Sequence, residues 1–345
     1  MTDVAGRRIA IIGGAGFIGH NLALALAKAR ADVHVIDSLQ VNNLLWFASR
    51  PETPSRALFL SMLNERLDLL RQAGIPLHPQ DARDYHALSR ILSDVQPSVV
   101  VHLAAVSHAG RSNKDPFSTF DHSLRTLENA LDWSRGDNAN IDRFVFLSSS
   151  MAYGNFETSE VTEDHPLNPI GIYGALKVAG EKLVIAYQQV FGLPYAIIRP
   201  SALYGPRCVS RRVGQIFIEN ALAGETLRME GDGVERLDFT YIDDLVAGIM
   251  LAISHPAARN DVFNLTYGSS RSIADLLAIV RERFPAIAVE YVPRDGLMPV
   301  RGTLSVEKAR RLLGYQPAYP LEVGFSRYID WYHELLARTG GSIRI

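Results

Sequence analysis

The segment GAGFIG at residues 14–19 constrains this chain more than any other feature of its sequence. It directly follows the apolar run from Arg8 to Ile12 and opens a helical pattern that extends to about Arg30, so a G-x-G-x-x-G motif lies between a strand and a helix. In that setting Gly16 lets the backbone approach a pyrophosphate, and Gly19 lets the helix pack closely on the strand. The phosphates then meet free N–H groups at the helix N-terminus. The segment therefore predicts a dinucleotide-binding turn.

Three further apolar runs follow at the intervals of an alternating α/β fold. They are Val33 to Ile36, Ser98 to His102 and Arg143 to Ser148, and a helical pattern precedes each of the last two. Continuous apolar strands separated by helices are typical of a parallel sheet that is covered on both faces. We therefore predict an α/β fold with a doubly wound parallel sheet, the Rossmann arrangement.

The character of the sequence changes after about Pro200. Loops there hold more proline and glycine, and the predicted strands Leu227 to Met229 and Asp261 to Leu265 are short. In open α/β folds, ligands bind at the carboxyl edge of the sheet, where a second domain can cover them. We predict an NAD-binding Rossmann domain over residues 1–200 and a smaller C-terminal α/β domain over residues 201–345 that mainly binds the substrate.

A long insertion separates Asp37 from about Ile75. Residues 57–72 within it have leucines at helical spacing. One interpretation is a surface excursion that packs on the edge of the sheet. The other is a functional element, since long connections often carry function.

Two acidic residues at predicted strand ends are candidates for cofactor binding. Asp37 ends the second strand, where its carboxylate can accept hydrogen bonds from the adenosine ribose and would repel a 2′-phosphate, which favours NAD over NADP. Asp81 follows a predicted third strand and lies within reach of the adenine. The alternative is that each is an ordinary turn acid that bonds its own backbone.

Tyr173 and Lys177 lie four residues apart on a predicted helix, so their side chains share one face. A phenol beside an ammonium suits a general base, because the positive charge favours the phenolate. Ser148, Ser149 and Ser150 end the preceding strand, at the edge that faces the cofactor. A hydroxyl there can bond the substrate oxygen that Tyr173 deprotonates. The alternative is that all of these residues are structural.

Composition excludes several other classes of protein. With 35 basic and 37 acidic residues the formal charge is −2, which argues against a nucleic-acid binder and against a polybasic membrane protein. The single cysteine, Cys208, rules out an internal disulfide framework and fits a reducing cytoplasm. No apolar run approaches the roughly 18 residues of a membrane span. The histidines have no clear metal spacing, so we expect no metal site.

Several motifs occur together in a recognisable order. They are VHLAA at 101–105, LSSSMAYG at 147–154, Tyr173-x-x-x-Lys177, RP at 199–200 with YGP at 204–206, and DFTYIDD at 238–244. From about residue 7 to residue 335 the chain resembles the extended short-chain dehydrogenase/reductase family, in its NAD-dependent nucleotide-sugar epimerase/dehydratase branch. The motifs are specific for the family and much less so for the substrate.

The resemblance implies roles for individual residues. Tyr173 is the expected base, and Lys177 is expected to bind the nicotinamide ribose of NAD and to lower the pKa of the tyrosine. In the family the third catalytic residue lies four positions before the tyrosine of the Tyr-Gly pair, so Tyr153 points to Ser149. The predicted cofactor contacts are Gly13, Gly16, Phe17, Ile18, Gly19, Asp37, Asp81, Ala82, Leu103, Ala104, Ala105 and Lys177.

Departures from the family pattern narrow the reaction. Similar 4,6-dehydratases carry an Asp-Glu pair, and similar decarboxylases a Glu, at positions that hold Ser150 and Met151 here. A methionine cannot transfer a proton, so we expect neither reaction. A 4-epimerase or a keto-sugar reductase or dehydrogenase remains, and the NAD preference implied by Asp37 favours the epimerase, which acts through a transient 4-keto sugar. A third hypothesis is a regulator that binds NAD without chemistry.

The expected substrate is a nucleotide sugar, although customary ligand contacts are replaced by Ala202 and Leu237. Arg236 and Arg301 can clamp a diphosphate, since guanidinium groups suit phosphate, or they can be surface residues. The predicted substrate contacts are Ser149, Ser150, Tyr173, Arg236 and Arg301. The insertion is loosely similar to that of uronate epimerases, so a UDP-sugar or UDP-uronate is expected.

The resemblance also implies a homodimer. In the family, the helix here predicted from Phe117 to Trp133 and the helix after Tyr173 pair across a two-fold axis as a four-helix bundle. Both helices have apolar surfaces, with Leu124, Leu127 and Leu131 on the first and Leu176, Leu183, Val184 and Tyr187 on the second. The alternative is that each helix only covers the sheet, which needs one apolar stripe.

Overall fold

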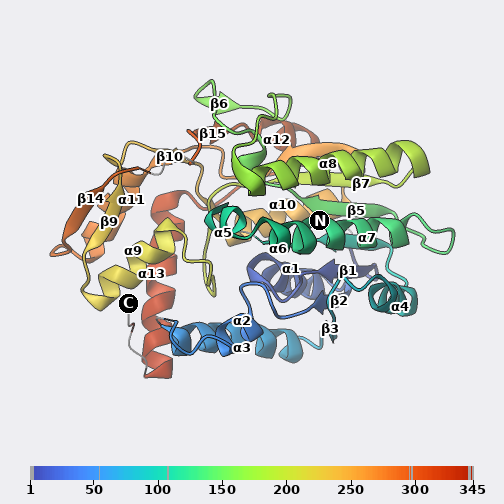
Figure 1. The fold of residues 1–345 in the computed structure, drawn as a ribbon, viewed down its shortest axis with the longest axis horizontal. Helices are drawn as coiled ribbons and strands as arrows, with labels where there is room; N and C mark the ends of the chain where they lie inside the picture. The colour runs from blue at the N-terminus through green and yellow to red at the C-terminus, as the bar shows by residue number, and fades with distance from the viewer. Residues whose placement is uncertain are drawn as a thin grey trace.

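Seven parallel strands form the central sheet of the computed structural model, which describes residues 4–53, 55–106, 109–294, 296, 298–340 and 343. Their order is β12-β7-β5-β4-β1-β2-β3 (Figure 1). The strands are β1 (Arg8–Ile12), β2 (Asp32–Asp37), β3 (Leu77–Pro79), β4 (Val99–His102), β5 (Arg143–Leu147), β7 (Tyr195–Arg199) and β12 (Asp261–Asn264). The order reverses direction between β1 and β4, and ligands bind at such a switch point. The predicted doubly wound Rossmann sheet is confirmed.

Both faces of the sheet are buried, which explains why its strands are continuous apolar runs. Along β1, Ile9 and Ile11 belong to one core, while Ala10 and Ile12 belong to the core on the opposite face. Helices α1 (Phe17–Lys28), α3 (Arg56–Gln72) and α10 (Ile242–Ser254) cover the first face. Helices α4 (Tyr85–Val95), α7 (Thr126–Ser134) and α8 (Gly171–Phe191) cover the second face.

Short elements connect these layers. Helix α7 continues from α6 (Pro116–Phe120) through the π-helical turn η1 (Asp121–Arg125), so the predicted helix 117–133 is one helix with a widened turn. The remaining short elements before residue 200 are α2 (Leu44–Ala48), α5 (Ala109–Lys114), η2 (Ser150–Ala152) and β6 (Glu160–Val161). None of the helices among the described residues is both long enough and apolar enough to cross a membrane.

Much of the chain after residue 200 lies outside the central sheet (Figure 1). Its helices are α9 (Val213–Ala223), α11 (Ile273–Arg283), α12 (Glu307–Leu313) and α13 (Leu321–Thr339), with η3 (Pro256–Ala258). Its strands form two-residue to four-residue pairs: β9 (Leu227–Glu230) with β14 (Val289–Val292), β10 (Arg236–Leu237) with β13 (Arg271–Ser272), β11 (Thr240–Tyr241) with β8 (Leu203–Tyr204), and β15 (Thr303–Leu304) with β6. Of these elements, α9, α11, α13, β9 and β14 are grouped at the left of the molecule in Figure 1, and α12 lies beside the sheet.

One strand lies elsewhere than the sequence suggested. The run from Asp261 to Leu265, expected in the C-terminal domain, forms β12 and pairs in parallel with β7 as the edge of the central sheet. Helix α10 also packs on this sheet, against α1, β5 and β7. A strand with buried Phe263 and Asn264 extends the parallel sheet because α10 supplies the crossover helix. Segments after residue 200 therefore contribute to both parts of the molecule.

The insertion after Asp37 is part of the core. Helix α3 packs against α1 and α2, and its Phe59, Met62 and Leu63 join the buried cluster of the first sheet face. Arg66 on the same helix is only 1% exposed, which is unusual for an arginine. An entirely buried guanidinium points to partners in the interior, and these lie in the candidate site.

Candidate active site

The glycine turn between β1 and α1 is shaped by close backbone contacts. Gly13 has a φ of +82°, and a Cβ there would lie 2.7 Å from the backbone nitrogen of Ala104, in the loop after β4. A Cβ on Gly19 would lie 2.5 Å from the Cα of Gly14, so only glycine lets α1 approach the turn. The turn thus opens the N-terminus of α1 toward a cavity at the switch point of the sheet.

This cavity gathers most of the residues predicted to bind the cofactor. Its lining also includes residues that were not predicted, among them Arg66 from α3 and Arg212 from the loop before α9. The predicted residues in its lining are Gly13, Gly16, Phe17, Ile18, Gly19, Asp37, Asp81, Ala82, Leu103, Ala104 and Ala105. The glycine cradle and the carboxylates at the ends of β2 and β3 fit the pyrophosphate and adenosine of a dinucleotide.

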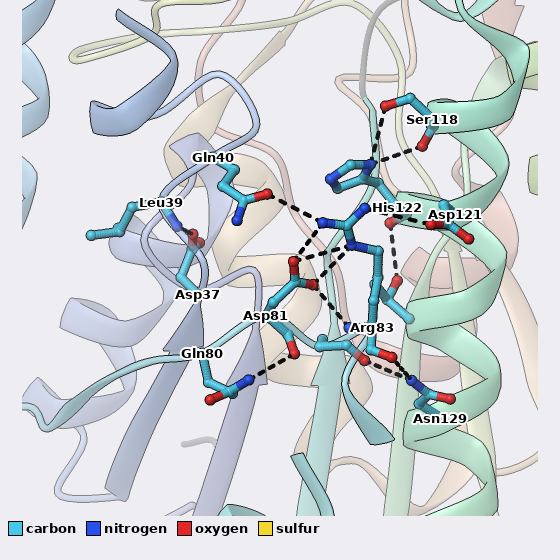
Figure 2. Close-up of polar contacts among 12 residues, drawn as sticks. Asp37, Leu39, Gln40, Gln80, Asp81, Arg83, Ser118, Asp121, His122 and Asn129 are labelled. Atoms are coloured by element: carbon cyan, nitrogen blue, oxygen red, sulfur yellow. Dashed lines mark hydrogen bonds and ion pairs between the residues drawn. The ribbon is translucent and has the colours of Figure 1, made fainter. Parts of the chain in front are cut away.

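Asp37 connects the end of β2 to the glycine turn. Its Oδ1 accepts a hydrogen bond from the Leu39 backbone N–H at 2.7 Å (Figure 2). Its Oδ2 accepts one from the Ala15 backbone N–H at 3.0 Å. Burial raises the pKa of the Asp37 carboxyl, although these N–H groups and the charge of Arg66 act in the opposite direction. Each oxygen keeps a second lone pair, so the carboxylate can also accept from a ribose hydroxyl.

Asp81 is paired within the chain. The guanidinium of Arg83 contacts it at 2.6 Å and also reaches Gln40 at 3.4 Å and Asp121 at 3.5 Å (Figure 2). Burial alone would raise the pKa of Asp81, but the hydrogen bonds and charge of Arg83 outweigh it and lower the pKa. Arg83 therefore ties the loops of Gln40 and Asp81 to the π-helical turn η1 at this end of the cavity, and the Asp81 carboxylate is ionised and paired.

Tyr173 and Lys177 lie on the first two turns of α8. The Nζ atom of Lys177 lies 5.8 Å from the centre of the Tyr173 ring and donates to the Leu147 carbonyl at the end of β5, at 2.6 Å. Burial lowers the pKa of Lys177 to about 8, against the opposing charge of Glu181. The ammonium is therefore charged at neutral pH and held beside the phenol.

The three adjacent serines have three different partners. Ser148 donates to Glu181, whose carboxylate also forms a buried ion pair with Arg199 at 2.7 Å. Ser150 donates to the hydroxyl of Ser201 at 3.2 Å. The hydroxyl of Ser149 lies close enough to Tyr173 to lower the pKa of the phenol, and its Oγ accepts from the backbone N–H of Met151 at 3.2 Å. The structure therefore brings Ser149 and Tyr173 together.

Arg212 is a site residue that the sequence interpretation missed. Burial raises the pKa of the Tyr173 phenol, while the charge of Arg212 and the hydrogen bond with Ser149 lower it. Arg212 is the N-cap residue of α9 and lines the cavity. The doublet Arg211-Arg212, a few residues after YGP at 204–206 and just before a helix, is the signal that could have identified it.

The two arginines predicted to clamp a diphosphate have different surroundings. The buried Nε of Arg301 has no hydrogen-bond partner among the residues that the structure describes, and burial together with the charges of Arg212 and Arg294 lowers the pKa of Arg301 to about 10. Arg236 instead donates to the hydroxyl and the carbonyl of Ser270. The structure thus associates Arg301 with Arg212, and the role of Arg236 stays a prediction.

Within the described ranges, no group of three or more His, Cys, Asp or Glu side chains is arranged to hold a metal ion.

Comparisons with known proteins agree with this geometry. Residues 9–266 match the model of the NAD dependent epimerase/dehydratase family. A dTDP-glucose 4,6-dehydratase from Streptomyces griseus is 32% identical over 68% of this chain and 71% of its own length. UDP-glucuronate 4-epimerase 2 from Arabidopsis thaliana is 27% identical over 95% of this chain and 76% of its own. The crystal structure of UDP-glucuronic acid 4-epimerase from Bacillus cereus, with UDP-glucuronic acid and NAD, superposes with a TM-score of 0.84 at 26% identity, over 95% of this chain and 99% of that one.

Proposed function

The chain belongs to the NAD-dependent epimerase/dehydratase family, and we propose that it is a nucleotide-sugar 4-epimerase that acts through a transient 4-keto sugar. The observation that carries this proposal is the grouping of Tyr173 with Ser149 and Lys177 at the end of β5, next to Arg212 of the cavity with the glycine cradle, at a site that offers no carboxylate at Met151. Such a site can move a hydroxyl proton but has no acid at that position to expel water or carbon dioxide.

When bound, NAD would supply the hydride-transfer chemistry at C4 of the sugar. The residues of the chain move the proton that accompanies this transfer. The Tyr173 phenolate would accept the proton of the 4-hydroxyl and return it to the 4-oxygen when the ketone is reduced, so the phenolate is regenerated in each cycle. Ser149 bonds the same oxygen, and the charges of Lys177 and Arg212 favour the phenolate.

The residue after Ser150 supports epimerisation over elimination. Met151 is 7% exposed and belongs to the short helix η2, directly after the serines. Relatives that eliminate water need an acid and a base at these two positions. The thioether of methionine supplies neither, so the C–O and C–C bonds of the sugar stay intact.

An anionic part of the substrate is expected at Arg301. Its unpartnered Nε and the neighbouring charges of Arg212 and Arg294 make a site that favours an anion. The diphosphate of a sugar nucleotide has the required charge and accepts bidentate bonds from guanidinium groups. A UDP-sugar or UDP-uronate is the substrate that we propose, the latter because several similar proteins are UDP-glucuronate 4-epimerases.

A panel of UDP-, GDP-, CDP- and dTDP-sugars, including uronates, tests the function. With a trace of NAD the expected product is the C4 stereoisomer of unchanged mass, and a substrate deuterated at C4 keeps its label. The Tyr173→Phe protein is the matched blank. Stoichiometric oxidation of NADH by a keto sugar would identify a reductase instead, and a mass loss of water or carbon dioxide would contradict the proposal.

We also propose that a second copy of the chain packs on α6 and α8, whose exposed apolar side chains lie on α6 and at the end of α8, where Phe191 contacts Arg135 just after α7. Leu127, Leu131 and Val184 are buried within the chain, so these residues cover the sheet. The exposed apolar side chains on these helices are Phe117 at 83%, Phe120 at 47%, Val190 at 71% and Phe191 at 48%. Sedimentation at micromolar concentration should give the mass of a dimer, and a monomeric mass would contradict this.

A further inference from the structure

A closed ring of hydrogen bonds links the glycine turn to the loop after β8. The Nδ1 atom of His20 bonds the Gly16 carbonyl at 2.8 Å, and its Nε2 atom bonds the Nε of Arg207 at 3.0 Å. The carbonyl of Arg207 in turn accepts from Arg66, through Nε at 3.1 Å and through Nη2. Arg66 returns to the glycine turn, where its Nη1 donates to the Ala15 carbonyl at 3.4 Å.

The chemistry of the ring allows one proton arrangement. The Nε of Arg207 always carries a hydrogen, so the Nε2 of His20 must accept, and its Nδ1 carries the proton that is donated to Gly16. His20 is therefore neutral. Burial and the charges of Arg66 and Arg207 lower its pKa well below the ordinary value, which agrees with this arrangement. We call Ala15, Gly16, His20, Arg66 and Arg207 the Arg207 clamp.

The clamp holds a loop whose backbone needs support. Arg207 and Arg211 have φ values of +63° and +48°, a conformation that is unfavourable for residues with a side chain. Such residues persist where their surroundings hold them. Arg207 is held through its carbonyl by Arg66, and through its guanidinium by His20, by Asn21 at 3.4 Å and by Glu65 at 3.3 Å.

The same loop leads directly into the candidate active site. Val209, Ser210 and Arg212 line the cavity within five residues of Arg207. Arg212 lies close enough to Tyr173 for its charge to act on the phenol. The clamp is therefore fixed to this loop five residues before Arg212.

We propose that Arg66 is a positioning residue of the reaction centre: through the Arg207 clamp it ties the NAD-binding turn to the loop that places Arg212 beside Tyr173. The insertion after Asp37 supplies Glu65 and Arg66 to this clamp, which gives the insertion a role in catalysis beyond packing. The inference deepens the proposed function, since it takes Tyr173 as the base.

Titration of the Tyr173 phenol in the NAD-bound protein tests the inference. An ultraviolet difference titration against the Tyr173→Phe protein isolates this phenol from the other tyrosines and needs no substrate. Breaking the clamp with Arg66→Met should raise the pKa of Tyr173 by about one pH unit, the lower end of the range for a neighbouring charge. Arg212→Met should raise it similarly. The double variant should show no further rise, because Arg66 acts through Arg212.

Matched variants separate positioning from charge and from general damage. Arg66→Lys keeps the positive charge but loses the planar guanidinium that bridges two carbonyls. The pKa of Tyr173 in the Arg66→Lys protein should therefore resemble its value in the Arg66→Met protein. Arg71→Met removes an exposed arginine of the same helix, which forms an ion pair with Asp68 in the turn before it, and should leave the pKa of Tyr173 unchanged. If Arg66→Met does not fold, His20→Phe opens the other arm of the ring at nearly constant volume and should give the same rise.

Three outcomes would overturn the inference: an unchanged pKa of Tyr173 in folded Arg66→Met and His20→Phe proteins, full restoration by Arg66→Lys, or an equal rise when Arg66→Met is added to Arg212→Met. Failure of the sugar-nucleotide panel would instead count against the proposed epimerase. The titration does not depend on that panel, so the two failures are distinguishable.

Discussion

The ammonium of Lys177 lies 5.8 Å from the centre of the Tyr173 ring, one turn further along α8. This relationship places a charge beside the phenol without a direct hydrogen bond between them, since Lys177 donates to the Leu147 carbonyl. The ammonium is thereby anchored to β5, and the phenol is free to bond Ser149 and the substrate oxygen. The predictions below follow from this arrangement and from the groups around it.

Replacing Tyr173 by phenylalanine removes the ionisable oxygen and keeps the ring. Activity should fall by roughly 10²–10⁴-fold, the usual contribution of a positioned acid–base group, while NAD binding is preserved. Steady-state rates and NAD binding by calorimetry measure the two effects. Tyr187→Phe, on the same helix, is the control and should keep its activity. Near-normal turnover by the Tyr173 variant would show that another group is the base.

The three serines should respond differently to alanine. Ser149→Ala removes the hydroxyl that bonds Tyr173 and should lower the rate by about tenfold or more, with little change in the free energy of unfolding. Ser148→Ala removes a buried donor to Glu181 and should cost about 1 kcal/mol of stability instead. Rates and urea unfolding of both proteins provide the comparison. A larger loss of rate in the Ser148 or Ser150 variant would move the catalytic role there.

Asp37 should determine the choice between NAD and NADP. In the Asp37→Asn protein the carboxylate charge near the ribose is lost, so a 2′-phosphate meets less repulsion and the neighbouring Arg66 can attract it. The ratio of the dissociation constants for NADP and NAD should fall by roughly tenfold, given that about 1.4 kcal/mol corresponds to a factor of ten. Asp32→Asn, at the start of the same strand, is the control. Equal binding of both cofactors by the unmutated protein would remove this argument.

Lys177 should produce a dependence on alkaline pH. Its pKa is lowered from the ordinary 10.5 to about 8, so the folded protein releases this proton earlier than the unfolded chain. The unfolded state binds more protons between these values, and the Lys177 contribution to stability therefore rises with pH from about 8 to 10.5. Below pH 8 the buried charge is a constant cost. Activity should decline above pH 8, as the ammonium beside Tyr173 is lost.

Unfolding free energies across this range measure the effect, with Lys177→Met as the reference. The free energy of unfolding of the wild type should rise relative to that of Lys177→Met as the pH increases from about 8 to 10.5. A difference between the two proteins that stays constant from pH 7 to pH 10.5 would contradict the lowered pKa.

Arg301 should destabilise the protein when no ligand is bound. Its Nε has no partner, and Arg212 and Arg294 repel it, so Arg301→Met should raise the free energy of unfolding on the order of 1 kcal/mol. The same variant should lose most of the stabilisation that UDP confers, which is about 2.7 kcal/mol for a ligand at one hundred times its dissociation constant. Thermal unfolding with and without UDP measures both effects. Arg228→Met, an exposed arginine on β9, is the control. Unimpaired stabilisation by UDP would place the diphosphate elsewhere.

The sequence was sufficient to predict the central fold, because the constraints involved are local. The glycine turn between β1 and α1 follows from backbone geometry within a few residues, and the parallel sheet follows from apolar runs such as Val99 to His102 that are buried on both faces. The cofactor residues of the turn and of the strand ends were predicted for the same reason. Their positions follow from where a strand stops and a helix begins.

Other features depend on which distant segments meet. Ser148, Ser149 and Ser150 differ little in sequence, and only the approach of α8 to the end of β5 decides which hydroxyl bonds Tyr173. The strand at Asp261–Asn264 joins the central sheet because β7 offers a parallel edge there. Its short apolar run does not indicate which strand it pairs with. Arg66 and Arg207 are 141 residues apart, and Arg212 and Arg301 lie in different loops, before α9 and before β15. Charges that far apart along the chain become neighbours only after folding, when burial removes the water that would otherwise screen them. The sequence therefore determined the cradle for the cofactor, and the tertiary structure decided which charges and hydroxyls surround the phenol of Tyr173.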